Sequence, residues 1–125
     1  MEIQSYFEHD SDDQIIQKRS ENELALWMEH VDYIINESEK LSKIASNTLH
    51  NDELKQRFLK FIEDSTEVTK TLNDYKKAMP NYKECDHLEC DMFYINTHEK
   101  VRQDYIKIIA AYRELKDVFY AQFFN

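Results

Sequence analysis

The feature that most constrains the fold is the complete absence of glycine from the 125-residue chain. Glycine reaches positive φ without steric cost, and hairpin turns, β-bulges and phosphate-binding loops depend on it. Proline, the other residue that interrupts regular structure, occurs once, at Pro80. The composition therefore excludes a sheet-rich fold, a dinucleotide-binding fingerprint and a P-loop, and it favours long uninterrupted helices.

Length and hydrophobic content predict one compact domain. The chain is close to the commonest size of a single domain. Hydrophobic residues make up 42% of it and aromatic residues 13%, which is enough to form a core although 33% of the residues are charged. We expect the chain to fold alone or as a small oligomer.

The charge balance and the cysteine content limit the partners and the compartment. The formal net charge is −9, and no basic stripe is available to bind phosphates, so neither nucleic acid nor an anionic membrane is an expected partner. Residues 1–13 are acidic and contain no long apolar run, which predicts no secretory signal and no membrane span. The two cysteines do not amount to a disulfide framework, and this agrees with a reducing, cytoplasmic location.

Apolar residues at spacings of three and four predict three helices, which follow an N-terminal arm or short helix over residues 1–19. Ser20 and Glu23 form a capping-box pattern at the start of the first helix. Pro80 ends the second helix, and a loop is expected over residues 81–86, although the pattern of residues 85–90 also fits a first turn of the third helix. The three predicted helices are residues 20–48, 52–79 and 87–123.

Short links between long helices predict an all-α, antiparallel up-down-up bundle. In the third helix, Met92, Ile95 and Phe123 are expected on the same core-facing side as Val101 and Phe119. This helix is longer than the other two predicted helices, so its end should extend beyond them.

Three short motifs resemble a group of small, functionally uncharacterised bacterial helical-bundle proteins. The motifs are Leu26-Trp27 near the start of the first helix, Glu37 and Leu41 further along it, and His98-Glu-Lys-Val-Arg102 in the last helix. The resemblance spans about residues 20–125. It implies a three-helix architecture and no particular activity.

A polar layer in the middle of the bundle is the first candidate site. Counting outward from the two turns places Ser38, Ser65 and either His98 or Arg102 at one height, where bundles build ligand sites. These residues could line a pocket for a small anion or metabolite. The full candidate set is Ser38, Ser65, Thr69, His98 and Arg102, flanked by Glu37 and Asp64. Alternatively, the hydroxyl residues only make room for larger neighbours, while His98 and Arg102 set the helix register.

Cys85, His87 and Cys90 are the second candidate, because thiolate and imidazole are ligands that zinc prefers. A fourth ligand and a tight Cys-x-x-Cys turn are missing, so two reduced cysteines are the favoured interpretation and metal binding the less favoured one. Only Glu84 and His87 match the Glu-x-x-His pattern of a di-iron bundle. No cofactor is expected. A nucleophile in a strained turn is also missing, so a catalytic role has no support.

The third candidate is the aromatic C-terminal segment, residues 118–125. Its aromatic side chains lie on more than one side of a helix and cannot all enter one narrow core: Phe119, Tyr120, Phe123 and Phe124. They either cover the arm through Tyr6 and Phe7 or form a homodimer contact, and we expect the homodimer. The expected function is therefore a non-enzymatic one through protein–protein contact or self-association. Binding of a small ligand by the His98 and Arg102 layer is the alternative.

Overall fold

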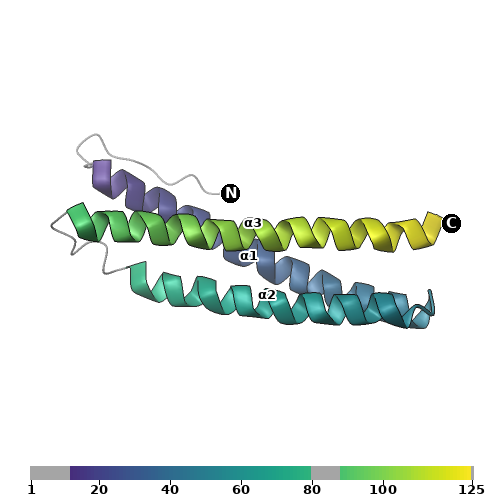
Figure 1. Cartoon of the computed structure of the whole chain (residues 1–125). Coiled ribbons are helices and arrows are strands. Elements are labelled where there is room, and N and C mark those ends of the chain that lie inside the picture. The colour runs from purple at the N-terminus through teal and green to yellow at the C-terminus, as the bar shows by residue number, and fades with distance from the viewer. Residues whose placement is uncertain (1–11, 80–87, 125) are drawn as a thin grey trace.

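A computed structural model describes residues 12–79 and 88–124, which form three long helices (Figure 1). Helix α1 spans Asp12–Asn47, α2 spans Asp52–Ala78 and α3 spans Leu88–Phe124. Helices α1 and α3 run in the same direction, and α2, which connects them in the sequence, runs in the opposite direction (Figure 1). The predicted all-α bundle of three packed helices is confirmed. Within the described residues, no helix carries the long apolar segment that a bilayer span requires.

The turn between α1 and α2 supplies its own cap. The Asn51 side chain accepts a hydrogen bond from the backbone N–H of Leu54 at 3.0 Å, which satisfies one of the free donors at the start of α2. His50 adopts a φ of 51°, a left-handed conformation that glycine usually takes. The observed bounds of α2 and α3 lie within one residue of the predicted ones.

Helix α1 starts at Asp12, eight residues before the predicted start at Ser20. The capping-box prediction is therefore wrong, because Ser20 lies inside the helix. The Glu23 carboxylate faces α3 instead and binds His98 and Arg102. The Glu23 side chain thus forms tertiary contacts with α3 and does not cap a helix. Residues 1–11 of the predicted arm, including Tyr6 and Phe7, lie outside the described residues, as do residues 81–86 of the predicted loop.

All three helices contribute to one hydrophobic core. Helices α1 and α2 make the most extensive contact, and the small side chains of Ser38, Ala45 and Ser65 are fully buried. Aromatic pairs join α2 to α3: the rings of Phe61 and Tyr112 stack with centroids 5.4 Å apart, and those of Phe58 and Phe119 meet edge to face at 5.9 Å. The other buried apolar residues are Leu24, Trp27, Val31, Ile34, Leu41, Leu54, Leu72, Tyr75, Met79, Val101, Ile108, Ile109 and Leu115.

The structure corrects the predicted core face of α3. Met92, Ile95 and Phe123 are 47%, 51% and 48% exposed, although their spacing predicted burial. The level at which Tyr75 of α2 meets His98 of α3 explains the exposure of Met92. Since α2 ends at Ala78, no described residue of α2 lies opposite residues 88–94.

Candidate functional site

Polar contacts between α1 and α3 repeat every seven residues. Three pairs, each separated by 75 residues in the sequence, lie at successive heptads. The pairs are Glu23 with His98, His30 with Tyr105, and Glu37 with Tyr112. A spacing of seven keeps side chains on one side of two helices that run in parallel. The α1–α3 contact is therefore a periodic polar seam. Glu23 lies at one end of the seam and Glu37 at the other.

The end of this seam that lies nearest the start of α1 joins all three helices. We call it the Glu23 cluster, consisting of Glu23, Tyr75, His98 and Arg102. The carboxylate of Glu23 on α1 lies 2.7 Å from Arg102 Nη2 and 3.4 Å from His98 Nε2 on α3. The hydroxyl of Tyr75 on α2 lies 2.7 Å from His98 Nδ1. His98 thus contacts both other helices.

The contacts of His98 define what it can do chemically. A neutral imidazole with its proton on Nε2 donates to Glu23 and accepts from the Tyr75 hydroxyl, so one tautomer satisfies both contacts. The ring also lies 5.0 Å from the ring of Trp27, and the side chain is only 12% exposed. Because protein groups occupy both ring nitrogens, His98 has no nitrogen free for a substrate in this arrangement.

The other end of the seam, nearest the end of α1, is the Glu37 cluster, which consists of Tyr33, Glu37, Tyr112 and Lys116. Lys116 Nζ lies 2.9 Å from the Glu37 carboxylate, the Tyr33 hydroxyl donates to it at 2.9 Å, and the Tyr112 hydroxyl also donates to it. Burial acts to raise the pKa of Glu37, but the hydrogen bonds from Lys116 and Tyr33 outweigh it and lower the pKa. The same carboxylate raises the pKa of Lys116 and of Tyr33.

The structure does not bring the seven residues of the predicted polar layer together. The Ser65 hydroxyl donates to the carbonyl of Phe61, and the Thr69 hydroxyl donates to the carbonyl of Ser65. Both hydroxyls therefore form hydrogen bonds within α2. Ser38 is fully buried, and its hydroxyl has no hydrogen-bond partner. Among the seven, only His98 and Arg102 share a cluster, where both bind the same carboxylate.

Sequence reasoning missed Glu23 and Tyr75 as members of the cluster around His98. The sequence pattern places Glu23 in a local cap and gives no sign that Tyr75 lies near His98. A signal for Glu23 was present, because Glu23, His30 and Glu37 are three polar residues at heptad spacing along the edge of an apolar stripe. Tyr75 carried no such signal, because its place on the apolar stripe of α2 is the same whether or not its hydroxyl forms a hydrogen bond.

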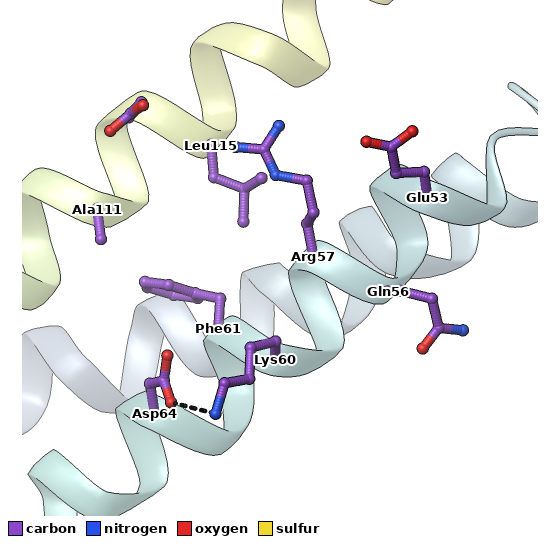
Figure 2. A pocket seen from close by; sticks show the side chains of 9 residues that line it. Glu53, Gln56, Arg57, Lys60, Phe61, Asp64, Ala111 and Leu115 are labelled. Carbon is purple, nitrogen blue, oxygen red and sulfur yellow. Dashed lines mark ion pairs between the residues drawn. The ribbon is translucent and has the colours of Figure 1, made fainter.

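Asp64 lies in a different place, at a groove between α2 and α3 (Figure 2). Phe61 and Leu115 face each other across it, and Asp64 pairs with Lys60 on its rim at 3.1 Å. The polar residues that line the groove are all exposed: Glu53, Gln56, Arg57, Lys60, Asp64 and Glu114. Exposed charges of both signs stay hydrated, so the groove offers an apolar floor but no desolvated polar group to select a ligand.

The cysteine prediction needs one correction. Cys90 is disulfide-bonded, not reduced, and the sequence has one other cysteine, Cys85. A sulfur atom in a disulfide does not present the thiolate that binds zinc. Cys85 and His87 of the proposed metal set lie outside the described residues. Over residues 12–79 and 88–124, no three potential ligands come together in a group that could hold a metal ion.

The predicted C-terminal contact residues divide into two kinds. Phe119 is 2% exposed and belongs to the core, so its prediction as an interface residue is wrong. Tyr120, Phe123 and Phe124 are 43%, 48% and 84% exposed. The rings of Phe123 and Phe119 meet edge to face with centroids 5.2 Å apart, and Phe123 remains about half exposed.

Comparison of the chain with models of known protein families, with curated proteins and with solved structures finds no match. The resemblance to a group of bacterial helical-bundle proteins therefore stays a prediction.

Proposed function

We propose that this protein acts through protein–protein contact, and that its first partner is a second copy of itself. The observation that supports this is the uneven distribution of exposed apolar side chains. Helix α2 exposes one large hydrophobic residue, Leu59, whereas α1 exposes Ile16, Leu26 and Tyr33. Helix α3 exposes Leu88, Met92, Phe93, Ile95, Ile106, Tyr120, Phe123 and Phe124.

Exposure on this scale has an energetic cost that association removes. Burial of apolar surface contributes about 25 cal/mol per Å², and a large contiguous apolar surface is rare on a monomer. Most of the exposed residues lie toward the two ends of α3, with Leu88 at 75% and Phe124 at 84% exposed, and Ile106 lies between the two groups. A partner that runs along α3 would cover both ends at once. The chain's net charge of −9 repels a second copy, so a contact between two copies needs acidic and basic groups that are matched locally.

Sedimentation equilibrium of the full chain tests this proposal. We expect a reversible dimer over a range from about 1 µM to about 1 mM, which spans the affinities of transient and stable complexes. A chain that stays monomeric over the whole range would contradict the proposal.

A matched pair of variants shows which surface is responsible. The double substitution Tyr120→Lys, Phe123→Lys places charge on exposed positions and should weaken the dimer while helicity and melting temperature hold. Leu59→Lys makes the same kind of change at the 40% exposed residue on α2 and should leave the dimer intact. Equal effects of the two changes would show that α3 is not the contact surface.

Binding of a small ligand at the Glu23 cluster is the second candidate function. In its favour, Arg102 is 41% exposed and shares the Glu23 carboxylate with His98. His98→Leu separates the two candidates, because it removes the imidazole and leaves the exposed face of α3 unchanged. If native mass spectrometry shows an added mass on the wild-type chain that is lost in His98→Leu, the ligand function is supported. If each protein shows only the mass of its own chain, the cluster is structural.

A further inference from the structure

Five exposed residues of α3 lie at one heptad position and form what we call the outer ridge. They are Met92, Glu99, Ile106, Arg113 and Tyr120. Three of them immediately follow a residue that contacts α1, since Glu99, Ile106 and Arg113 come directly after His98, Tyr105 and Tyr112. One residue turns a helix by about 100°. The outer ridge therefore lies beside the polar seam and faces solvent.

The side chains of the outer ridge are complementary to those of a second ridge that runs in the antiparallel direction. Ile106 stands at its centre, with acidic Glu99 seven residues before and basic Arg113 seven residues after. Met92 and Tyr120 stand at equal distances further out. Reversing the order therefore places the acid on the base and an apolar residue on an aromatic one.

We infer that a second copy of this chain docks on the outer ridge in the antiparallel direction, with the two-fold axis at Ile106. This rests on the proposed self-association and specifies its geometry. Each Glu99 then lies opposite Arg113 of the other copy, and each Met92 lies opposite Tyr120. Ile106 meets its own equivalent at the axis. The arrangement is isologous, as a closed dimer requires.

The parallel arrangement is the competing geometry, and it is electrostatically worse. It places Glu99 opposite Glu99 and Arg113 opposite Arg113, which opposes association at both levels. The antiparallel dimer instead forms two acid–base pairs, one on each side of the axis. It also brings the exposed start of α3, with Leu88, against the exposed end of the second copy, with Phe123 and Phe124.

The contacts that the ridge makes within one chain leave its charges available. Glu99 accepts a hydrogen bond from Gln103 at 2.9 Å and lies 3.9 Å from Arg102 Nε, and its side chain is 56% exposed. The ion pairs formed between described residues do not include Arg113. Exposed pairs of this kind contribute little, so exchanging them for contacts across a dimer has a low cost.

The length and winding of the ridge fit a helix–helix interface. From Met92 to Tyr120 it covers about 42 Å at 1.5 Å per residue. A seven-residue repeat drifts by about 20° per heptad around a straight helix, so the ridge winds slowly, and a partner helix follows it in a left-handed supercoil. The uninterrupted length of α3, 37 residues, provides this surface on one rigid element.

Charge exchange at two ridge positions tests the geometry. Glu99→Arg and Arg113→Glu are measured singly and together by sedimentation equilibrium, with circular dichroism to verify folding. Lys107→Glu is the matched control, because it makes the same charge change as Arg113→Glu at an exposed position off the ridge. Each single exchange disturbs two pairs per dimer, so we expect the dissociation constant to rise about tenfold. The double exchange should restore it to within about threefold of wild type, and Lys107→Glu should stay close to wild type.

The outcomes separate this inference from the proposed function. A monomeric wild type would overturn both. A dimeric wild type with weakened single variants and a restored double variant supports the antiparallel geometry. A dimer that the single exchanges leave unchanged, or that the double exchange does not restore, keeps self-association and overturns the geometry. If Glu99→Arg fails to fold, Met92→Glu with Tyr120→Arg gives the same comparison at the outer level of the ridge.

Discussion

Helix α1 makes two contacts of opposite character. Its contact with α2 is the most extensive in the bundle, and the fully buried residues of α1 include Ile34, Ser38 and Ala45. Its contact with α3 is the polar seam, where long side chains meet at heptad intervals. Apolar packing supplies most of the folding free energy but accepts many helix offsets, whereas hydrogen bonds between specific partners accept few. The comparison indicates that the α1–α2 contact stabilises the fold and that the seam selects the position of α3.

Removing apolar volume from the α1–α2 contact should have the largest effect. Ile34→Ala leaves a cavity at a fully buried position and should lower the free energy of unfolding by about 2–5 kcal/mol, measured by urea denaturation. Ile34→Val should cost about 0.5–1.5 kcal/mol. A loss for Ile34→Ala no larger than that of the seam variants below would contradict the division between the two contacts.

Neutralising Glu37 should have the next largest effect. Glu37→Gln removes the charged acceptor of Lys116, which is 28% exposed, and weakens the hydrogen bond from Tyr112. We expect a loss of about 1–3 kcal/mol in unfolding free energy, because partly buried groups lose a charged partner. The neighbouring exposed Glu39→Gln is the control and should change stability by less than about 0.5 kcal/mol.

The Glu37 cluster should also give the seam a pH dependence. Because the folded chain lowers the pKa of Glu37 below its ordinary 4.5, the unfolded chain binds the proton first. The stabilisation is therefore complete above pH 4.5 and is lost as pH falls through the lower folded value. Unfolding free energies of wild type and Glu37→Gln should converge in that acid range. A constant difference down to the acid limit would show that the carboxylate's charge is not responsible.

The Glu23 cluster should contribute less than the Glu37 cluster, because its ion pair is more open to solvent. The side chains of Glu23 and Arg102 are 37% and 41% exposed. We expect Glu23→Gln to cost about 0.5–1 kcal/mol, and a double-mutant cycle with Arg102→Gln to give a coupling of the same size. A coupling larger than the loss at Glu37 would reverse the order of the two clusters.

The smallest predicted effect has the opposite sign. Ser38→Ala removes a fully buried hydroxyl that has no hydrogen-bond partner, so stability should stay level or rise by up to about 1 kcal/mol. Ser65→Ala is the comparison, because the Ser65 hydroxyl is bonded to the Phe61 carbonyl and gains less by removal. A clear loss in Ser38→Ala would show that this hydroxyl contributes a contact to the α1–α2 interface.

The fold was accessible from the sequence because its signals are local. Spacing of apolar residues indicates where a helix runs, Asn51 marks the start of α2, and Pro80 follows its end. The start of α1 was not accessible, because the pattern of Ser20 and Glu23 is compatible with a local cap and with a tertiary ion pair. Which of the two forms depends on Arg102, which is far away in the sequence.

The exposed face of α3 shows a second limit. Periodicity places Phe119 and Phe123 on one stripe but does not state which of them another helix covers. Phe119 meets Phe58 and is buried, while Phe123, one turn further along, is half exposed. The same holds for Met92 and Ile95 at the other end. Burial is a property of the neighbours, and the pattern of one helix carries no information on where its neighbours end.

The sequence by itself determined that this chain is helical, because a chain without glycine and with apolar residues at helical spacing has no competing regular structure. The tertiary structure alone decided that Glu23 meets His98 and that Glu37 meets Tyr112, each 75 residues away. Those partners fix the offset between α1 and α3, and they select it among the offsets that core packing along all three helices allows. Local propensity acts over a few residues, whereas an offset between helices is a property of the whole core.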